Sequence, residues 1–160
     1  MESNRPELGK QERRRIQRLA VRALWTAWWR ARRLGRGADV GALLPGVAAM
    51  ATPTVDPEDI FRVVDGVARI AVFWKRDKRC FYRAFAVASV LHRYGRPACL
   101  EFGLKLQDGR RRQCHCWVTT GGRVIGETTD PYTLFPLPAG AWQGYVRYWL
   151  ADGDAGGAPC

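Results

Sequence analysis

This sequence of 160 residues lacks an apolar run long enough to span a membrane. Its most apolar N-terminal stretch is broken by Arg18, Arg22 and Arg30, and falls far short of the roughly 20 uninterrupted apolar residues required. The Arg-rich N-terminal region also contains no apolar run followed by a small-residue cleavage site, so no secretory signal is expected.

Acidic residues are scarce as well, and the resulting excess of positive charge is concentrated at one end of the chain. Asp and Glu number 15 against 26 Lys and Arg, which gives a net charge of +11. Eleven of the basic residues lie within residues 1–36, beside three Glu. Such an excess favours acidic partners, namely nucleic acid, an anionic membrane surface or an acidic peptide.

The few cysteines follow no pattern typical of disulfides or of a metal site. There are five, an odd number: Cys80, Cys99, Cys114, Cys116 and Cys160. We therefore expect a reduced, cytoplasmic protein. The triplet 114–116 could suggest zinc, but alternate side chains on a strand point to opposite faces, so Cys114, His115 and Cys116 cannot bind one ion. No Cys-x-x-Cys pair completes a site, and no metal or cofactor is expected.

The residue pattern predicts one domain of the α+β class with short appendages. We expect a basic amphipathic helical extension and linker (1–55), a main folded domain (56–150) and a flexible tail (151–160). Apolar spacing and turn residues predict helices from Gln11, from Pro57 and over 80–94, then antiparallel strands over 98–106, 111–119 and 123–127.

Cys80 is the first candidate for catalysis. It falls at the start of a predicted helix, where unpaired backbone N–H groups and the helix dipole stabilise a thiolate and lower the pKa of the thiol. Four basic residues between positions 75 and 79 add positive charge. A small buried cysteine in a core is the alternative interpretation.

His115 is the candidate base, because an imidazole suits proton transfer near pH 7. The other histidine, His92, is expected to lie on the surface near the end of its helix. By strand alternation, Cys114 and Cys116 share the face opposite His115, and we expect them to pack behind the sheet.

Two acids could orient His115. If the turn after Thr119 has three residues, Glu127 lies directly opposite His115; if it consists of Gly121 and Gly122 alone, Thr128 takes that position instead. Asp130 is the rival, although its place before a proline favours a turn. The order cysteine, histidine, acid on a helix start and two strands is typical of a catalytic triad.

Residues 79–127 resemble the leader-removing B proteins of lasso-peptide biosynthesis, which are transglutaminase-like cysteine peptidases. The resembling parts are a helix headed by Cys80 with an Arg three residues on, a first strand over 96–103, and His115-Cys-Trp-Val before a strand that ends in Glu127. The chain departs from the family pattern where Cys116 replaces the usual Ala and Glu127 the more usual Asp.

The resemblance implies a papain- or transglutaminase-like fold and a triad of Cys80, His115 and either Glu127 or Asp130. It implies removal of the leader from a ribosomally made precursor, which frees the core amine for macrocyclisation. Residues 1–73 lack the strand-rich pattern of a leader-recognition domain. A separate recognition protein, the precursor peptide and an ATP-dependent macrocyclase are therefore the expected partners.

Three alternatives remain open. The Arg-rich helix with Trp25, Trp28 and Trp29 is compatible with nucleic-acid binding. The same helix could lie on a membrane surface, although packing on the peptidase or docking to a partner is the favoured interpretation. The same triad could also transfer the acyl group to an amine instead of water.

Overall fold

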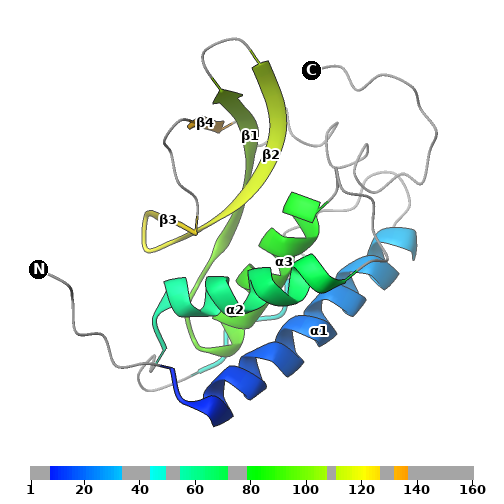
Figure 1. The fold of residues 1–160 in the computed structure, drawn as a ribbon, viewed down its shortest axis with the longest axis vertical. Helices are drawn as coiled ribbons and strands as arrows, with labels where there is room; N and C mark the ends of the chain where they lie inside the picture. The colour runs from blue at the N-terminus through cyan, green and yellow to red at the C-terminus, as the bar shows by residue number, and fades with distance from the viewer. Residues whose placement is uncertain are drawn as a thin grey trace, which may run out of the picture.

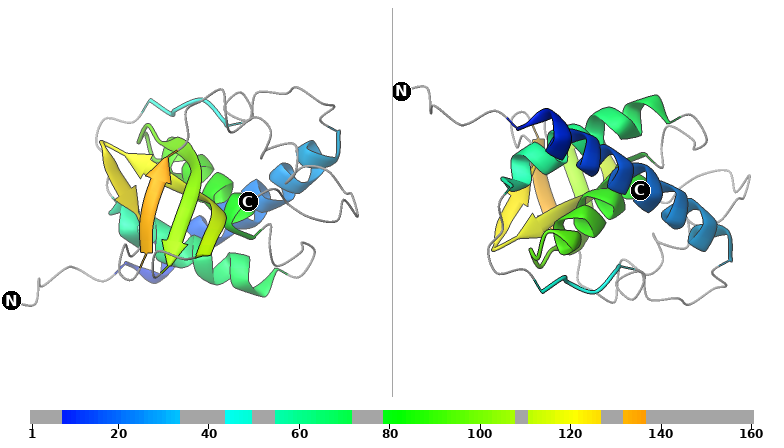
Figure 2. Two further views of the ribbon diagram at one scale, coloured as in Figure 1. Left: turned by 90° about the horizontal axis from the view of Figure 1, so that it is seen from above. Right: turned by 90° about the horizontal axis from the view of Figure 1, so that it is seen from below.

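Three helices precede four strands in the computed structural model of this chain, which describes residues 8–33, 44–49, 55–71, 79–107, 111–126 and 132–136. The elements are α1 (Lys10–Arg33), α2 (Pro57–Ile70), α3 (Arg79–Arg93), β1 (Cys99–Gln107), β2 (Arg111–Thr120), β3 (Arg123–Ile125) and β4 (Tyr132–Pro136). The helices gather on one side of the sheet (Figures 1 and 2). The predicted α+β class is confirmed.

The sheet is antiparallel, with strand order β3-β2-β1-β4. The β2–β3 hairpin closes through Gly121 and Gly122, whose φ angles are 55° and 75°. A two-residue turn of this kind requires positive φ at both positions, which glycine adopts without strain.

Two details of the sheet differ from the sequence prediction. β3 ends at Ile125 rather than at residue 127, because Gly126 has a φ of 68° and leaves the extended conformation. β4 was not predicted. It pairs with β1 on the side away from β2, and no turn residues in the sequence indicate this non-local contact.

Local sequence chemistry accounts for the ends of α2 and α3. Asp56 caps α2 by accepting a hydrogen bond of 2.8 Å from the backbone N–H of Glu58, and Pro57 occupies the first turn, as predicted. Gly95, with a φ of 70°, follows the end of α3 in the left-handed conformation, also as predicted.

α3 is buried on nearly all sides, because α1, α2 and β2 all pack against it. The predicted inner face is buried apart from half-buried Cys80, but so are its neighbours Phe81, Tyr82 and Phe85. A helix enclosed in this way holds its first turn in a fixed position relative to the sheet.

α1 belongs to the same hydrophobic core as the other elements. Ile16, Ala20 and Leu24 are at most 1% exposed and cluster with residues of α2 and α3. The proposed boundary between residues 55 and 56 stays a prediction, and the predicted tail at 151–160 lies outside the described residues. None of the described helices combines the length and the apolar character needed to cross a membrane.

His92 is a structural residue and not, as expected, a surface one. It is 9% exposed, and its Nδ1 lies 2.6 Å from the carbonyl oxygen of Pro45. Its Nε2 accepts the backbone N–H of Ala98 at 3.1 Å. Nε2 also lies 2.9 Å from the carbonyl oxygen of Ala98, so His92 joins both the 44–49 segment and Ala98 to the end of α3.

Candidate functional site

Cys80 is the second residue of α3, so the sulfur belongs to the first turn of the helix, as the sequence predicted. Its side chain is half-buried and packs against the core cluster. The backbone N–H groups of a first turn have no intrahelical acceptor, and the helix dipole places partial positive charge there. Both features stabilise a thiolate over a thiol.

His115 lies in the middle of β2, directly opposite Gly103 of β1. It is 8% exposed, and its ring stacks on that of Trp117, with centroids 6.2 Å apart and an interplanar angle of 21°. Residues two apart on a strand share a face, so His115 and Trp117 lie on one side of the sheet.

The opposite face of β2 meets the helices. Cys116 and Val118 are at most 2% exposed and belong to the cluster formed by the helical core residues. Cys116 therefore packs between sheet and helices, not behind the sheet as expected. The side chain of Cys114 lies outside the described residues.

The helix that begins next to Cys80 and the strand that carries His115 are thus in contact. Among the described side chains of β2, Cys116 and Val118 reach the helical core, whereas His115 lies on the opposite face of the strand. The pairing of the Cys80 sulfur with the His115 imidazole stays a prediction.

Glu127 and Asp130, the two candidate acids, lie outside the described residues. The turn consists of Gly121 and Gly122 alone, and Val118 faces Ile125. Extended by three residues on each strand, this register places Thr128 opposite His115, so cross-strand pairing does not favour Glu127. The bend at Gly126 ends the regular strand first, and the choice of acid stays a prediction.

β2 is a continuous strand through positions 114–116. Successive side chains of a strand point to opposite faces, so these three side chains cannot all lie on one face. Within the described part of the chain, no three histidine, cysteine or acidic side chains are grouped so that they could hold a metal ion.

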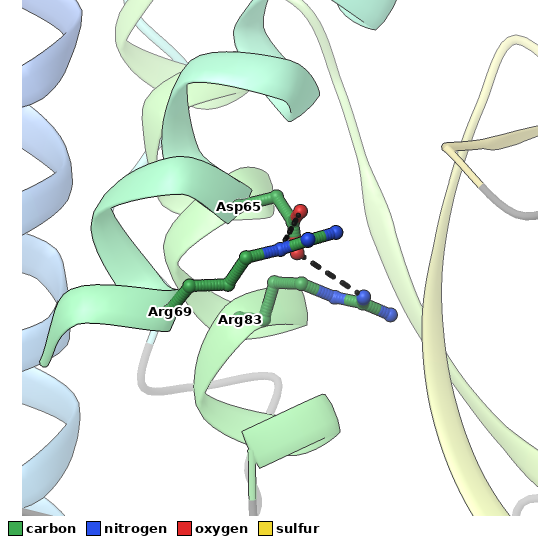
Figure 3. Close-up of polar contacts among 3 residues, drawn as sticks. All are labelled: Asp65, Arg69 and Arg83. Atoms are coloured by element: carbon green, nitrogen blue, oxygen red, sulfur yellow. Dashed lines mark hydrogen bonds and ion pairs between the residues drawn. The ribbon is translucent and has the colours of Figure 1, made fainter. Parts of the chain in front are cut away.

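A charged cluster that the sequence interpretation missed joins α2 to α3 (Figure 3). Asp65, 9% exposed, accepts a hydrogen bond of 2.8 Å from Nε of Arg69 and one of 3.4 Å from Nη1 of Arg83. The Arg83 guanidinium also lies over the Phe61 ring, 5.2 Å from its centroid. In the sequence, the one indication of this cluster was Asp65, an acidic residue beside the predicted apolar stripe of α2.

Arg83 lies near Cys80 on the surface of α3, because residues three apart on a helix are neighbours. Asp65 and Phe61 hold its side chain from α2. α2 therefore holds the side chain of a residue one helical turn from the candidate nucleophile, with its charge paired to Asp65.

Residues 17–136 match the family model of the transglutaminase-like superfamily. The chain belongs to this superfamily. The match extends from α1 to β4, and it confirms the predicted transglutaminase-like fold. The fold is typically that of cysteine peptidases and acyltransferases. No curated protein and no solved structure matches the chain.

Proposed function

We propose that this superfamily member is a cysteine peptidase that removes the leader from a ribosomally made lasso precursor peptide. The observation that carries the proposal is the position of Cys80 in the first turn of α3, in a chain that belongs to the transglutaminase-like superfamily. The resemblance of residues 79–127 to lasso B proteins supplies the substrate class. The odd number of cysteines and the lack of a spacing typical of disulfides favour a reducing compartment, and we place the protein in the cytoplasm.

In this mechanism, the Cys80 thiolate attacks the carbonyl carbon at the junction of leader and core, and its own backbone N–H stabilises the oxyanion. His115 protonates the departing core amine as the carbon–nitrogen bond breaks. It then takes a proton from water, which attacks the thioester and releases the leader as a carboxylate. Glu127 or Asp130 orients the imidazole.

The products define the expected partners. A freed core amine is the nucleophile that an ATP-dependent macrocyclase joins to a carboxylate of the core. The precursor must be brought to the peptidase by a separate leader-recognition protein. We propose these three as partners of the chain.

The test is cleavage of a purified precursor in the presence of its recognition protein, followed by mass spectrometry. Cys80→Ala is expected to abolish cleavage while the circular dichroism spectrum and melting temperature are retained. Cys99→Ala is the matched control, because Cys99 is an exposed free cysteine on β1, and it should cleave like the wild type. Normal cleavage by Cys80→Ala would overturn the proposal.

Acyl transfer is the second candidate function, favoured by the membership of the chain in a superfamily that includes acyltransferases. A thioester on Cys80 partitions between water and amines. The same assay, repeated with an added primary amine, separates the two. A leader that ends in an amide supports transfer, whereas a leader that ends in a carboxylate at every amine concentration excludes it.

A further inference from the structure

α1 lies on the outside of the helical layer, where one of its faces packs on α2 and α3 (Figure 2). That inner face consists of apolar residues that are at most 9% exposed: Ile16, Ala20, Ala23, Leu24 and Ala27. Because the core already covers these residues, an external partner cannot contact them. The opposite, outer face is the part of α1 that a partner can reach.

A second apolar row runs along this outer face. Val21, Trp25 and Trp29 recur at intervals of four residues, so they lie in line on one side of the helix. They are 57%, 52% and 42% exposed. Of the five large apolar side chains that are exposed in the described part of the chain, three belong to this row. Exposed apolar residues scattered singly are normal, but their gathering on one helix face indicates a contact with another surface.

The two exposed indole rings of this row are held in place by a third. Trp28 is half-buried and packs on the hydrophobic core. The centroid of its ring lies 5.2 Å from that of Trp25 and 6.2 Å from that of Trp29. Each exposed ring therefore contacts a ring that the core holds, so binding through these rings costs little conformational entropy.

Towards the N-terminus of α1, the same face is positively charged. Arg14 and Arg18 lie in line with Val21 at spacings of four and three residues, and both are exposed. Neither forms an ion pair with a carboxylate among the residues that the structure describes. α1 carries nine basic residues and a single acidic one, Glu12, which is bonded to the core residue Tyr94. The outer face thus joins a basic half to an aromatic half.

The size of the outer face favours a lipid surface over a protein as its partner. From Arg14 to Trp29 the row extends about 22 Å, and a helix with its side chains is about 10 Å wide. The face covers on the order of 200 Å², whereas a stable protein interface buries about 800 Å² on each partner. A lipid surface needs no such area, because tryptophan rings settle among the headgroups and arginines are attracted to anionic lipids.

We propose that the outer face of α1 binds an anionic membrane surface, with the helix axis parallel to the plane of the membrane. Trp25 and Trp29 lie at the level of the headgroups, and Arg14 and Arg18 pair with the phosphates of anionic lipids. The contact is peripheral, because the inner face of α1 stays in the protein core. This inference does not depend on the proposed peptidase function.

Co-sedimentation of the full chain with vesicles tests the aromatic half. Vesicles of phosphatidylcholine and phosphatidylglycerol in a ratio of about 2:1 should bind the wild type at about 0.15 M salt, and phosphatidylcholine vesicles should bind it at least about tenfold more weakly. Trp25→Ala combined with Trp29→Ala should lower the partition coefficient for the anionic vesicles at least about tenfold. Ile70→Ala is the matched control, because Ile70 is an exposed apolar residue at the end of α2, and it should bind like the wild type.

Arg14→Gln and Arg18→Gln test the basic half. Each should weaken binding to the anionic vesicles by about fivefold, because one basic residue near an anionic lipid surface contributes roughly that factor. Arg123→Gln removes the same charge from an exposed position on β3, and it should change binding by less than about twofold. Equal losses in all three variants would mean that the basic chain attracts anionic lipid without using α1, and would overturn the proposal.

Tryptophan fluorescence provides a second measurement that does not rely on the alanine variants. Lipids brominated in the upper part of the acyl chains should quench the wild type. Trp25→Phe combined with Trp29→Phe keeps aromatic rings against Trp28, and it should lose most of this quenching.

Absence of binding to anionic vesicles, or quenching that the two phenylalanine substitutions leave unchanged, would overturn the proposal. Retention of random duplex DNA without binding to vesicles would assign the outer face of α1 to nucleic acid, and would overturn it as well. Either result leaves the peptidase proposal unaffected.

Discussion

Replacement of Gly126 by alanine tests how the end of β3 is positioned, and with it the chain that leads to the candidate acids. Gly126 has a φ of 68°, and a Cβ added there would overlap the ring of Phe61 on α2. Left-handed φ costs an alanine about 1 kcal/mol, and forcing extra volume into a packed contact costs about 1–3 kcal/mol more. Gly126→Ala should therefore lower the free energy of unfolding by about 2–4 kcal/mol.

Gly122→Ala is the matched control. Its φ of 75° is similar, but a Cβ there would meet no atom within 4 Å. Only the conformational cost of about 1 kcal/mol remains. Urea denaturation of the two variants and the wild type measures the difference, which isolates the contact with Phe61.

Combining Phe61→Ala with Gly126→Ala completes a double-mutant cycle, because Phe61→Ala removes the ring that the new methyl group meets. The double variant should be more stable than the sum of the single effects predicts, by about 1 kcal/mol or more. Equal losses for Gly126→Ala and Gly122→Ala, with additive behaviour in the cycle, would refute this packing of β3 on α2.

Two further predictions concern polar contacts between helices. Asp65→Asn should destabilise the fold by about 2–3 kcal/mol in urea denaturation, because it leaves the mostly buried Arg83 without its carboxylate. Arg69→Gln, which removes the exposed partner of Asp65, should cost less than about 1 kcal/mol. A larger loss for Arg69→Gln than for Asp65→Asn would contradict the role of Asp65 in holding Arg83. Burial and a hydrogen bond to Glu12 raise the pKa of Tyr94 above its ordinary value of 10.0. The folded state therefore holds the proton of the Tyr94 hydroxyl more tightly than the unfolded state does. This difference stabilises the fold fully below pH 10, and the stabilisation is lost as the pH rises, by about 1.4 kcal/mol per pH unit. Tyr94→Phe should lose stability less steeply above pH 10, and identical slopes would contradict the pKa shift.

Features set by neighbouring residues were predictable from the sequence. Asp56 and Pro57 start α2, Gly95 ends α3, and glycines at 121 and 122 form the turn between β2 and β3. Each acts through its own backbone conformation or through a hydrogen bond within a few residues, so no knowledge of the tertiary structure is needed.

Features set by distant residues were not predictable. β4 depends on pairing with β1, and His92 is buried because Pro45 and Ala98 supply its partners. Cys116 contacts the helices because α3 covers the side of the sheet on which Cys116 lies. Strand alternation predicts which side chains share a face but not which face meets the core.

The candidate site divides in the same way. The position of Cys80 in a first helical turn follows from local pattern, as does that of His115 in the middle of a strand. The role of Asp65 in holding Arg83 required the packing of α2 on α3. Sequence periodicity identifies helix faces, but it does not pair the faces of different helices.

The most direct test of the proposed catalytic pair is the pH dependence of Cys80 alkylation by iodoacetamide, followed by mass spectrometry of the Cys80 peptide in wild type and His115→Asn. If His115 pairs with Cys80, the wild-type thiol reacts with a midpoint well below the pH of roughly 8.5 typical of free cysteine, and His115→Asn moves this midpoint upward. A wild-type midpoint at the free-cysteine value, unchanged in His115→Asn, would contradict this pairing.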